Sequence, residues 1–313
     1  MTTPTAESLR RACADEMSRN PRGFGDCDWL REAFLTVPRE HFVPDQVWWP
    51  TAGDDGLHTL LDRTVRPQEW LTRVYAPGVP LITQMDDGAV PPTGRATGSF
   101  TSSVSAPGVI IELLRHLAPE PGDRIMEIGT GTGYTTALLA TRTGASQVVT
   151  IEIDTHLAAR ATQRLAMLNL HPLVITGDGE LGHETAEPYD RIVATASVRQ
   201  IPHTWISQLR PGGSLVLPLD TPFGWDLLLR LESDGRGRAY GRFLERVEFM
   251  RVRGQRKRVP YADLGWPSGA DPEQWDKLHV MVGPEGQRIT LPKAGPGIGQ
   301  ELGHRPASPT AAG

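Results

Sequence analysis

The segment Arg124-Ile-Met-Glu-Ile-Gly-Thr-Gly-Thr-Gly-Tyr134 constrains the fold more than any other stretch of the chain. Its first part is a short apolar strand, which runs into glycines at three alternate positions, Gly129, Gly131 and Gly133, and a helical pattern follows at once. Only glycine lets a ligand approach the backbone closely, and strand, glycine-rich turn and helix form the first half of a nucleotide-binding βα unit. The sequence therefore predicts a nucleotide or nucleoside site in an α/β domain.

The spacing of the glycines narrows the class of ligand. A dinucleotide fingerprint needs glycine at the sixth position of the motif, where this chain has Tyr134, and this disfavours a dehydrogenase. An acidic residue, Glu127, precedes the turn, and Thr130 lies within it. This arrangement suits a nucleoside without a pyrophosphate, of which S-adenosyl-L-methionine is the common one. We expect it as the cofactor.

Predicted strands and helices alternate through the middle of the chain. The strands are expected at 125–128, 147–152, 173–176, 191–195 and 214–218, and the helices at 107–117, 157–168 and 204–209. Strands separated by helices favour a parallel sheet with right-handed crossovers. The expected fold class is α/β, with a doubly wound, Rossmann-like sheet of the class I methyltransferase type.

Three regions are expected along the chain. Residues 1–106 are predicted to form a mainly helical cover with a few short strands, and residues 107–231 the donor-binding domain. Residues 232–313 are predicted to be a C-terminal extension, with a weak strand signal at Phe243–Met250. From about Pro292 the composition is rich in glycine, proline and alanine, which is typical of a disordered tail.

Composition excludes several classes of protein. The net charge of −5 provides no bulk attraction to nucleic acid. No apolar run approaches the roughly 20 residues needed to span a bilayer, and no signal-peptide pattern opens the sequence. Cys13 and Cys27 lack metal-ligand spacing and fit reduced thiols. We expect a cytoplasmic protein with no metal and no nucleic-acid or membrane partner.

Residues that follow the strands complete the expected donor site, because ligands of open α/β sheets bind outside the carboxyl ends of the strands. Glu152, with Ile153 next to it, is placed to accept hydrogen bonds from both ribose hydroxyls. Asp178, between Gly177 and Gly179, is placed to accept from the adenine amino group. Thr195 is expected near the methionine part of the donor.

The chain also resembles the protein-L-isoaspartate O-methyltransferases, over roughly residues 28 to 220 and in collinear order. The resemblance is carried by six segments: Val37-Pro-Arg-Glu-His-Phe-Val-Pro44, Val104-Ser-Ala-Pro107, Glu127-Ile-Gly-Thr-Gly-Thr-Gly-Tyr134, Gly177-Asp-Gly179, Tyr189-Asp-Arg-Ile-Val193 and Leu209-Arg-Pro-Gly-Gly-Ser-Leu-Val-Leu-Pro218. In that family the segment matching Val104–Pro107 lies over the methyl donor and contacts the substrate carboxylate. The resemblance implies that role for Ser105.

Features outside the shared motifs resemble one bacterial branch. These are the run Phe100-Thr-Ser-Ser-Val-Ser105, the pair Trp48-Trp49 and the segment Ile82–Asp87, together with the length after Leu231, which standard repair enzymes are expected to lack. Members of that branch methylate an aspartate in a ribosomally made macrocyclic peptide (a lanthipeptide, graspetide or lasso peptide), and the ester collapses to an aspartimide. They usually carry a further serine where this chain has Val104. The resemblance implies a modified, Asp-containing precursor peptide as the partner.

The expected chemistry needs no catalytic triad, because a carboxylate is ionised at neutral pH and a sulfonium methyl is already activated. The enzyme has to align the reacting atoms and exclude water. Ser102, Ser103 and Ser105 precede a helix expected near Pro107, whose N-terminus favours an anion. The alternative is that these serines only cap that helix.

Other interpretations stay open. Isoaspartate repair is the second enzymatic hypothesis, and a non-catalytic donor-binding scaffold is the third. The basic run Arg251–Arg258 is either a solvated face or a docking site for an acidic peptide, and His41 and the Trp48-Trp49 pair are expected to be structural.

Overall fold

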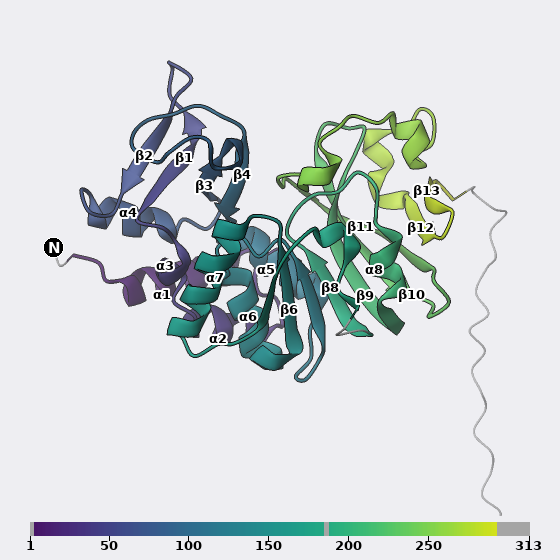
Figure 1. Ribbon diagram of the computed structural model, residues 1–313, viewed down its shortest axis with the longest axis horizontal. Coiled ribbons are helices and arrows are strands. Elements are labelled where there is room, and N and C mark those ends of the chain that lie inside the picture. Colours follow the sequence, from purple (N-terminus) through teal and green to yellow (C-terminus); the bar gives the residue numbers. More distant parts are fainter. Residues whose placement is uncertain (1–2, 185–187, 293–313) are drawn as a thin grey trace, which may run out of the picture.

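A nine-stranded sheet forms the centre of the molecule in the residues that the computed structural model describes, 3–184 and 188–292. Its strand order is β13-β12-β11-β10-β9-β8-β5-β6-β7 (Figure 1). The strands are β5 (Ile125–Ile128), β6 (Val148–Glu152), β7 (Leu173–Thr176), β8 (Tyr189–Ala194), β9 (Leu209–Asp220), β10 (Asp226–Ser233), β11 (Ala239–Val247), β12 (His279–Gly283) and β13 (Gly286–Thr290). The strands from β7 to β9 are parallel, and those from β9 to β13 are antiparallel.

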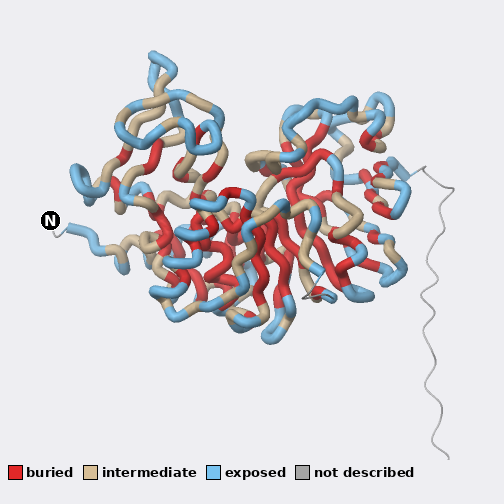
Figure 2. The backbone as a smooth tube through the Cα atoms, in the orientation of Figure 1, coloured by how far each residue is buried: buried red, intermediate tan, exposed pale blue. Residues whose placement is uncertain are grey.

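Both faces of the central sheet are buried (Figure 2). Side chains alternate between two cores, so that Ile125 belongs to one and Met126 to the other. The first core is shared with α1 (Ala6–Arg19), α2 (Asp28–Thr36), α5 (Pro107–Leu117), α6 (Tyr134–Thr143) and α7 (Thr155–Met167), and the second with α8 (His203–Ser207). The expected doubly wound α/β fold is confirmed, and each predicted central strand and helix is present within a few residues of its expected bounds.

The N-terminal region contains the predicted helices, among them α1 and α2, and its short strands join into a sheet that was not predicted. It contains the short helices α3 (Arg39–Phe42) and α4 (Pro67–Val74) and a second, antiparallel sheet in the order β2-β1-β3-β4, made of β1 (Gln46–Ala52), β2 (His58–Asp62), β3 (Leu81–Met85) and β4 (Phe100–Val104). This sheet has a small core of its own around Trp48, Ile82 and Met85. The serine-rich run is therefore mostly a strand, β4, and not a loop before a helix.

The C-terminal extension is part of the main sheet. The predicted boundary at Leu231 falls inside β10, with which β11 pairs along its whole length, and Ala239 and Phe243 of β11 are buried in the second core. The 3-10 helices η5 (Arg253–Gln255), η6 (Tyr261–Leu264) and η7 (Pro272–Lys277) connect β11 to β12. The predicted disordered tail lies outside the described residues. Among the helices that are described, none combines the length and apolarity needed to cross a membrane.

Candidate active site

A cavity lies at the carboxyl ends of β5, β6 and β8, between β4 on one side and residues 250–256 on the other. It encloses about 990 Å³, including open solvent at its mouth. Most of the predicted site residues line it: Ser102, Ser103, Ser105, Gly129, Thr130, Gly131, Tyr134, Glu152, Ile153, Asp178, Gly179 and Thr195. The structure thus brings the predicted donor residues and the predicted serines to one place.

The glycine turn is held in shape by polar contacts. Gly129 has a φ of 93°, and a Cβ there would lie 2.7 Å from Thr195 Oγ1, so no other residue fits. The Thr195 hydroxyl donates to the Gly129 carbonyl at 2.6 Å. The amide of Gly131 donates to Glu152 Oε2 at 2.8 Å. Glu152 therefore links the end of β6 to the turn that follows β5.

Glu152 keeps capacity for a ligand. Its Oε1 accepts from the Asp154 amide at 3.0 Å, and burial raises the pKa of its carboxyl group. A carboxylate offers about four acceptor positions, of which these two backbone contacts use two. The remaining positions can take two hydroxyl donors from the cavity.

The turn after β7 closes over β5. A Cβ at Gly179 would lie 2.6 Å from Ile128 Cγ2, so glycine is required for this approach. Asp178 Oδ1 accepts from the Glu180 amide at 3.0 Å and begins the 3-10 helix η3 (Gly179–Leu181). Asp178 and the 41% exposed Ile153 both reach the cavity wall, where one offers an acceptor and the other an apolar surface.

Three predicted site residues lie behind the wall of the cavity instead of in it. Gly133, at the start of α6, packs against Leu165 of α7, 3.4 Å from the position of its missing Cβ. The Gly177 amide donates to the Glu152 carbonyl at 2.9 Å, and the residue leads into the turn at Asp178. Glu127 is fully buried, and its Oε2 accepts from Thr136 and Thr150 at 2.5 and 2.8 Å.

Glu127 predicts a pH dependence of stability. Burial raises the pKa of its carboxyl group to about 7, and Oε1 has no partner in the described part of the chain. As the pH rises from about 4.5 to 7, the unfolded chain releases this proton first, so stability falls across that window and levels off above it. Glu127→Gln keeps an acceptor for both threonines, and we expect it to be more stable than the wild type at pH 8 by up to about 3 kcal/mol.

Urea unfolding of both proteins at pH 5 and pH 8 measures this difference. Equal stability changes at the two pH values would contradict it.

The serines do not cap the following helix. The N-cap of α5 is Ala106 and makes no side-chain hydrogen bond, so the capping alternative is wrong. One amide of the first turn of α5 is also occupied, because Gly108 donates to the Pro77 carbonyl at 2.9 Å. Ser102 Oγ accepts from Thr83 at 2.9 Å. Within the described residues the Ser105 hydroxyl makes no hydrogen bond, so it is available to a ligand.

Sequence reasoning missed Arg39, which positions Ser105. Its guanidinium is fully buried and donates to the carbonyls of Val74 at 2.8 Å and Ser105 at 2.7 Å, and it lies 5.1 Å from the centre of the Tyr134 ring. His41, in the same motif, instead contacts the Arg164 carbonyl at 2.7 Å and does not line the cavity, as expected for a structural residue. The sequence alone does not separate Arg39 from the neighbouring polar residues Glu40 and His41.

We expect Arg39→Lys to reduce methyl transfer about tenfold or more, because a single ammonium cannot span both carbonyls and Ser105 loses its fixed backbone. Donor affinity, measured by calorimetric titration, should change much less than kcat. Equal fold-losses in donor affinity and in kcat would indicate general damage to the fold.

The basic run is more than a solvated face. Arg251, Arg253 and Arg256 line the cavity. Asp87, which follows β3 in the N-terminal sheet, pairs with Arg253 at 3.1 Å and with Arg256 at 2.6 Å, and Arg253 also lies 3.4 Å from Asp154. These ion pairs connect the N-terminal sheet to the C-terminal segment across the mouth of the cavity.

Comparison with known proteins points to one family. Residues 94–257 match the family described as protein-L-isoaspartate(D-aspartate) O-methyltransferase. The chain is 33% identical over 229 residues to the protein-L-isoaspartate O-methyltransferase of Methylorubrum extorquens, covering 73% of this chain and 82% of that one. It is also 33% identical to the protein of the same name from Ignicoccus hospitalis, covering 64% and 78%.

Solved structures agree on the fold. A protein-L-isoaspartate O-methyltransferase aligns with a TM-score of 0.65 at 18% identity, covering 90% of this chain and 99% of that chain. A beta-aspartate methyltransferase (PCMT) from Plasmodium falciparum, solved with S-adenosyl-L-homocysteine, aligns with a TM-score of 0.56 at 17% identity, covering 78% and 98%. The alignment with the first covers 90% of this chain, so it extends past Leu231 into the C-terminal extension.

Proposed function

The chain belongs to the protein-L-isoaspartate O-methyltransferase family, and on that basis we propose that it uses S-adenosyl-L-methionine to methylate the free carboxylate of L-isoaspartyl residues in proteins and peptides. The sequence favours an aspartate in a macrocyclic peptide as the first substrate hypothesis and isoaspartate repair as the second. The named relatives favour repair.

The donor, when bound, supplies a methyl group on a sulfonium sulfur, which needs no further activation. Glu152 and the Gly129–Gly133 turn bind and orient it, and Asp178 accepts from its base. Ser105 donates its hydroxyl hydrogen to the substrate carboxylate and aligns one oxygen with the methyl carbon. Enclosure of the anion removes the water that would otherwise solvate it.

One observation carries this proposal. The Ser105 hydroxyl makes no hydrogen bond in the described chain, and Ser105 lines the same cavity as Glu152 and the glycine turn. The backbone carbonyl of Ser105 is held by the buried Arg39. A hydroxyl group that is free to donate a hydrogen bond, next to the site proposed for the methyl donor, suits an anionic methyl acceptor such as a carboxylate.

The reaction explains what happens to the product. A methyl ester is a better electrophile than a carboxylate, so the backbone nitrogen of the next residue attacks it, methanol leaves and a five-membered succinimide forms. Opening of this ring by water yields aspartyl or isoaspartyl peptide.

The test compares three acceptors at equal concentration: a linear isoaspartyl peptide, the same peptide with aspartate, and an aspartate-containing cyclic peptide. With radiolabelled donor we expect label in the isoaspartyl peptide alone. Label in the cyclic peptide alone would replace repair with peptide maturation. Binding of the methyl donor without transfer to any of the three acceptors would support the hypothesis of a non-catalytic, donor-binding scaffold.

Methylation of an aspartate in a macrocyclic peptide is the second candidate, and β4 favours it. Thr101, Ser102 and Ser103 line the cavity beside Ser105, so the acceptor wall carries a row of hydroxyl groups along β4. In that case mass spectrometry of the cyclic peptide would show gain of one methyl and then net loss of one water.

The arginines at the mouth predict an effect on substrate binding. Arg256 is exposed and pairs with Asp87 through two contacts of 2.6 and 2.9 Å. Arg256→Ala should raise KM for an acidic acceptor peptide by roughly three- to tenfold and leave kcat unchanged, because the lost attraction acts before the chemical step. Arg258→Ala, an exposed arginine that does not line the cavity, is the matched control. Equal KM values in the two variants would count against a docking role.

A further inference from the structure

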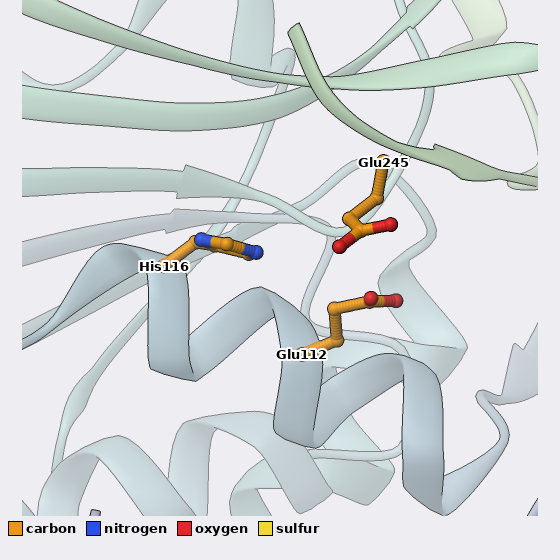
Figure 3. Close-up of side chains that lie close together, drawn as sticks. All are labelled: Glu112, His116 and Glu245. Carbon is orange, nitrogen blue, oxygen red and sulfur yellow. The ribbon is translucent and has the colours of Figure 1, made fainter. Parts of the chain in front are cut away.

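Three potential metal ligands meet on the far side of α5 from the glycine turn. Glu112 and His116 project from α5 toward Glu245 on β11, as Figure 3 shows. Each offers one ligand atom, and the three atoms lie within 4.8 Å of one another. None of the three lines the active-site cavity. The cluster is therefore separate from the methyltransferase site.

Two of these three residues carry a buried polar atom without a partner in the described chain. The Glu112 side chain belongs to a residue that is only 6% exposed, and its Oε1 has no hydrogen-bond partner in the described chain. The same holds for Nε2 of His116. Buried polar atoms are nearly always paired, because an unmet donor or acceptor loses the hydrogen bonds that water gave it. These two point to a group that is absent here.

Neighbouring arginines do not supply the missing partner of Glu112. Arg22 pairs with Glu245 at 2.8 Å, and Arg115 donates to the Pro21 carbonyl at 3.2 Å. Arg230 also lies near enough to act on His116 electrostatically. Within the described residues, none of these arginines forms an ion pair with Glu112. Arg22 and Arg115 act on Glu112 only at longer range, and the direct ion pair of Arg22 is to Glu245.

We propose that Glu112, His116 and Glu245 bind a divalent transition-metal cation, with Zn²⁺ as the representative ion. An imidazole nitrogen and two carboxylate oxygens are ligands that Zn²⁺ accepts, and the fourth position can hold water. Tetrahedral bonds of 2.0–2.1 Å place ligand atoms about 3.3 Å apart, so the side chains have to close by about 1.5 Å. Rotation within the two glutamate side chains covers that distance.

Because Glu112 and His116 lie on α5 and Glu245 on β11, the ion would join the helix that follows Ser105 to the C-terminal part of the sheet.

The test is calorimetric titration of ZnCl₂ into the full chain after chelator treatment and its removal. We expect one site per chain, at least tenfold weaker in Glu112→Gln and in His116→Ala. His171→Ala and Glu248→Gln remove exposed groups elsewhere and should bind as the wild type does. Co²⁺ in place of Zn²⁺ should give the visible absorption of a low-coordinate site in the wild type and lose it in His116→Ala.

Stability gives a second readout that does not depend on activity. Without metal, Glu112→Gln should be no less stable than the wild type, because it removes a buried carboxylate charge and leaves the helix intact. With saturating Zn²⁺ the order should reverse, since only the wild type gains binding free energy. Zinc binding of equal strength in Glu112→Gln, His116→Ala and the wild type, or none in the wild type, would overturn the proposal.

Discussion

Ser105→Ala is expected to lower kcat for methyl transfer by about 100-fold, because loss of the hydroxyl leaves the substrate carboxylate without the donor that orients it. Donor affinity should not change, since the residues proposed to contact the donor lie at the ends of β5 and β6 and in the turn after β7. Fixed-time assays with radiolabelled methyl donor measure kcat, and calorimetric titration measures the Kd of the donor on the same protein preparations.

The control for this variant is Ser207→Ala, which removes an exposed serine hydroxyl that donates only to the Thr204 carbonyl of its own helix. It should retain full activity. A wild-type kcat in Ser105→Ala would show that the Ser105 hydroxyl does not orient the substrate, and it would contradict the argument on which the proposed function rests.

Glu152→Ala is expected to weaken donor binding by about 1.5–3 kcal/mol, which is roughly 10- to 150-fold in Kd. Two effects add. The ribose hydroxyls lose a charged acceptor, and the amides of Gly131 and Asp154 lose the oxygens that now hold the glycine turn.

Titration of S-adenosyl-L-homocysteine into Glu152→Ala and Glu152→Gln separates the two effects. Glutamine has only one oxygen, so it can keep one of the two backbone contacts and should lie between alanine and the wild type. An unchanged Kd in Glu152→Ala would exclude this residue from the donor site.

The sequence predicted the central sheet well because its signals are local. The apolar run 125–128, the three glycines and the acid at 152 are each set by a strand end, a turn or a helix start, and topology then brings them together. Glu127 was misplaced for the same reason. Its position at the strand end suggested a ligand contact, yet alternation along β5 turns its side chain inward, toward Thr136 and Thr150.

The remaining features depend on contacts between distant segments. Arg39 acts on Ser105, 66 positions later, and Asp87 pairs with Arg256, 169 positions later. Neither pairing has a periodicity or spacing that a single sequence displays. The N-terminal sheet was missed because its strands are short and rich in proline and turn residues, a composition that equally suits irregular structure.

The division of the cavity between two sheets has a consequence for how such a chain can diverge. The parallel strands carry the residues proposed to hold the donor, whereas β4 belongs to a small sheet with a separate core around Trp48, Ile82 and Met85. Substitutions of cavity-lining side chains on β4 can therefore reshape the acceptor wall while the residues proposed to hold the donor stay the same. Such a chain can evolve a preference for a new methyl acceptor while it continues to use the same methyl donor. Mutant libraries made to alter the substrate should therefore be confined to residues 81–104.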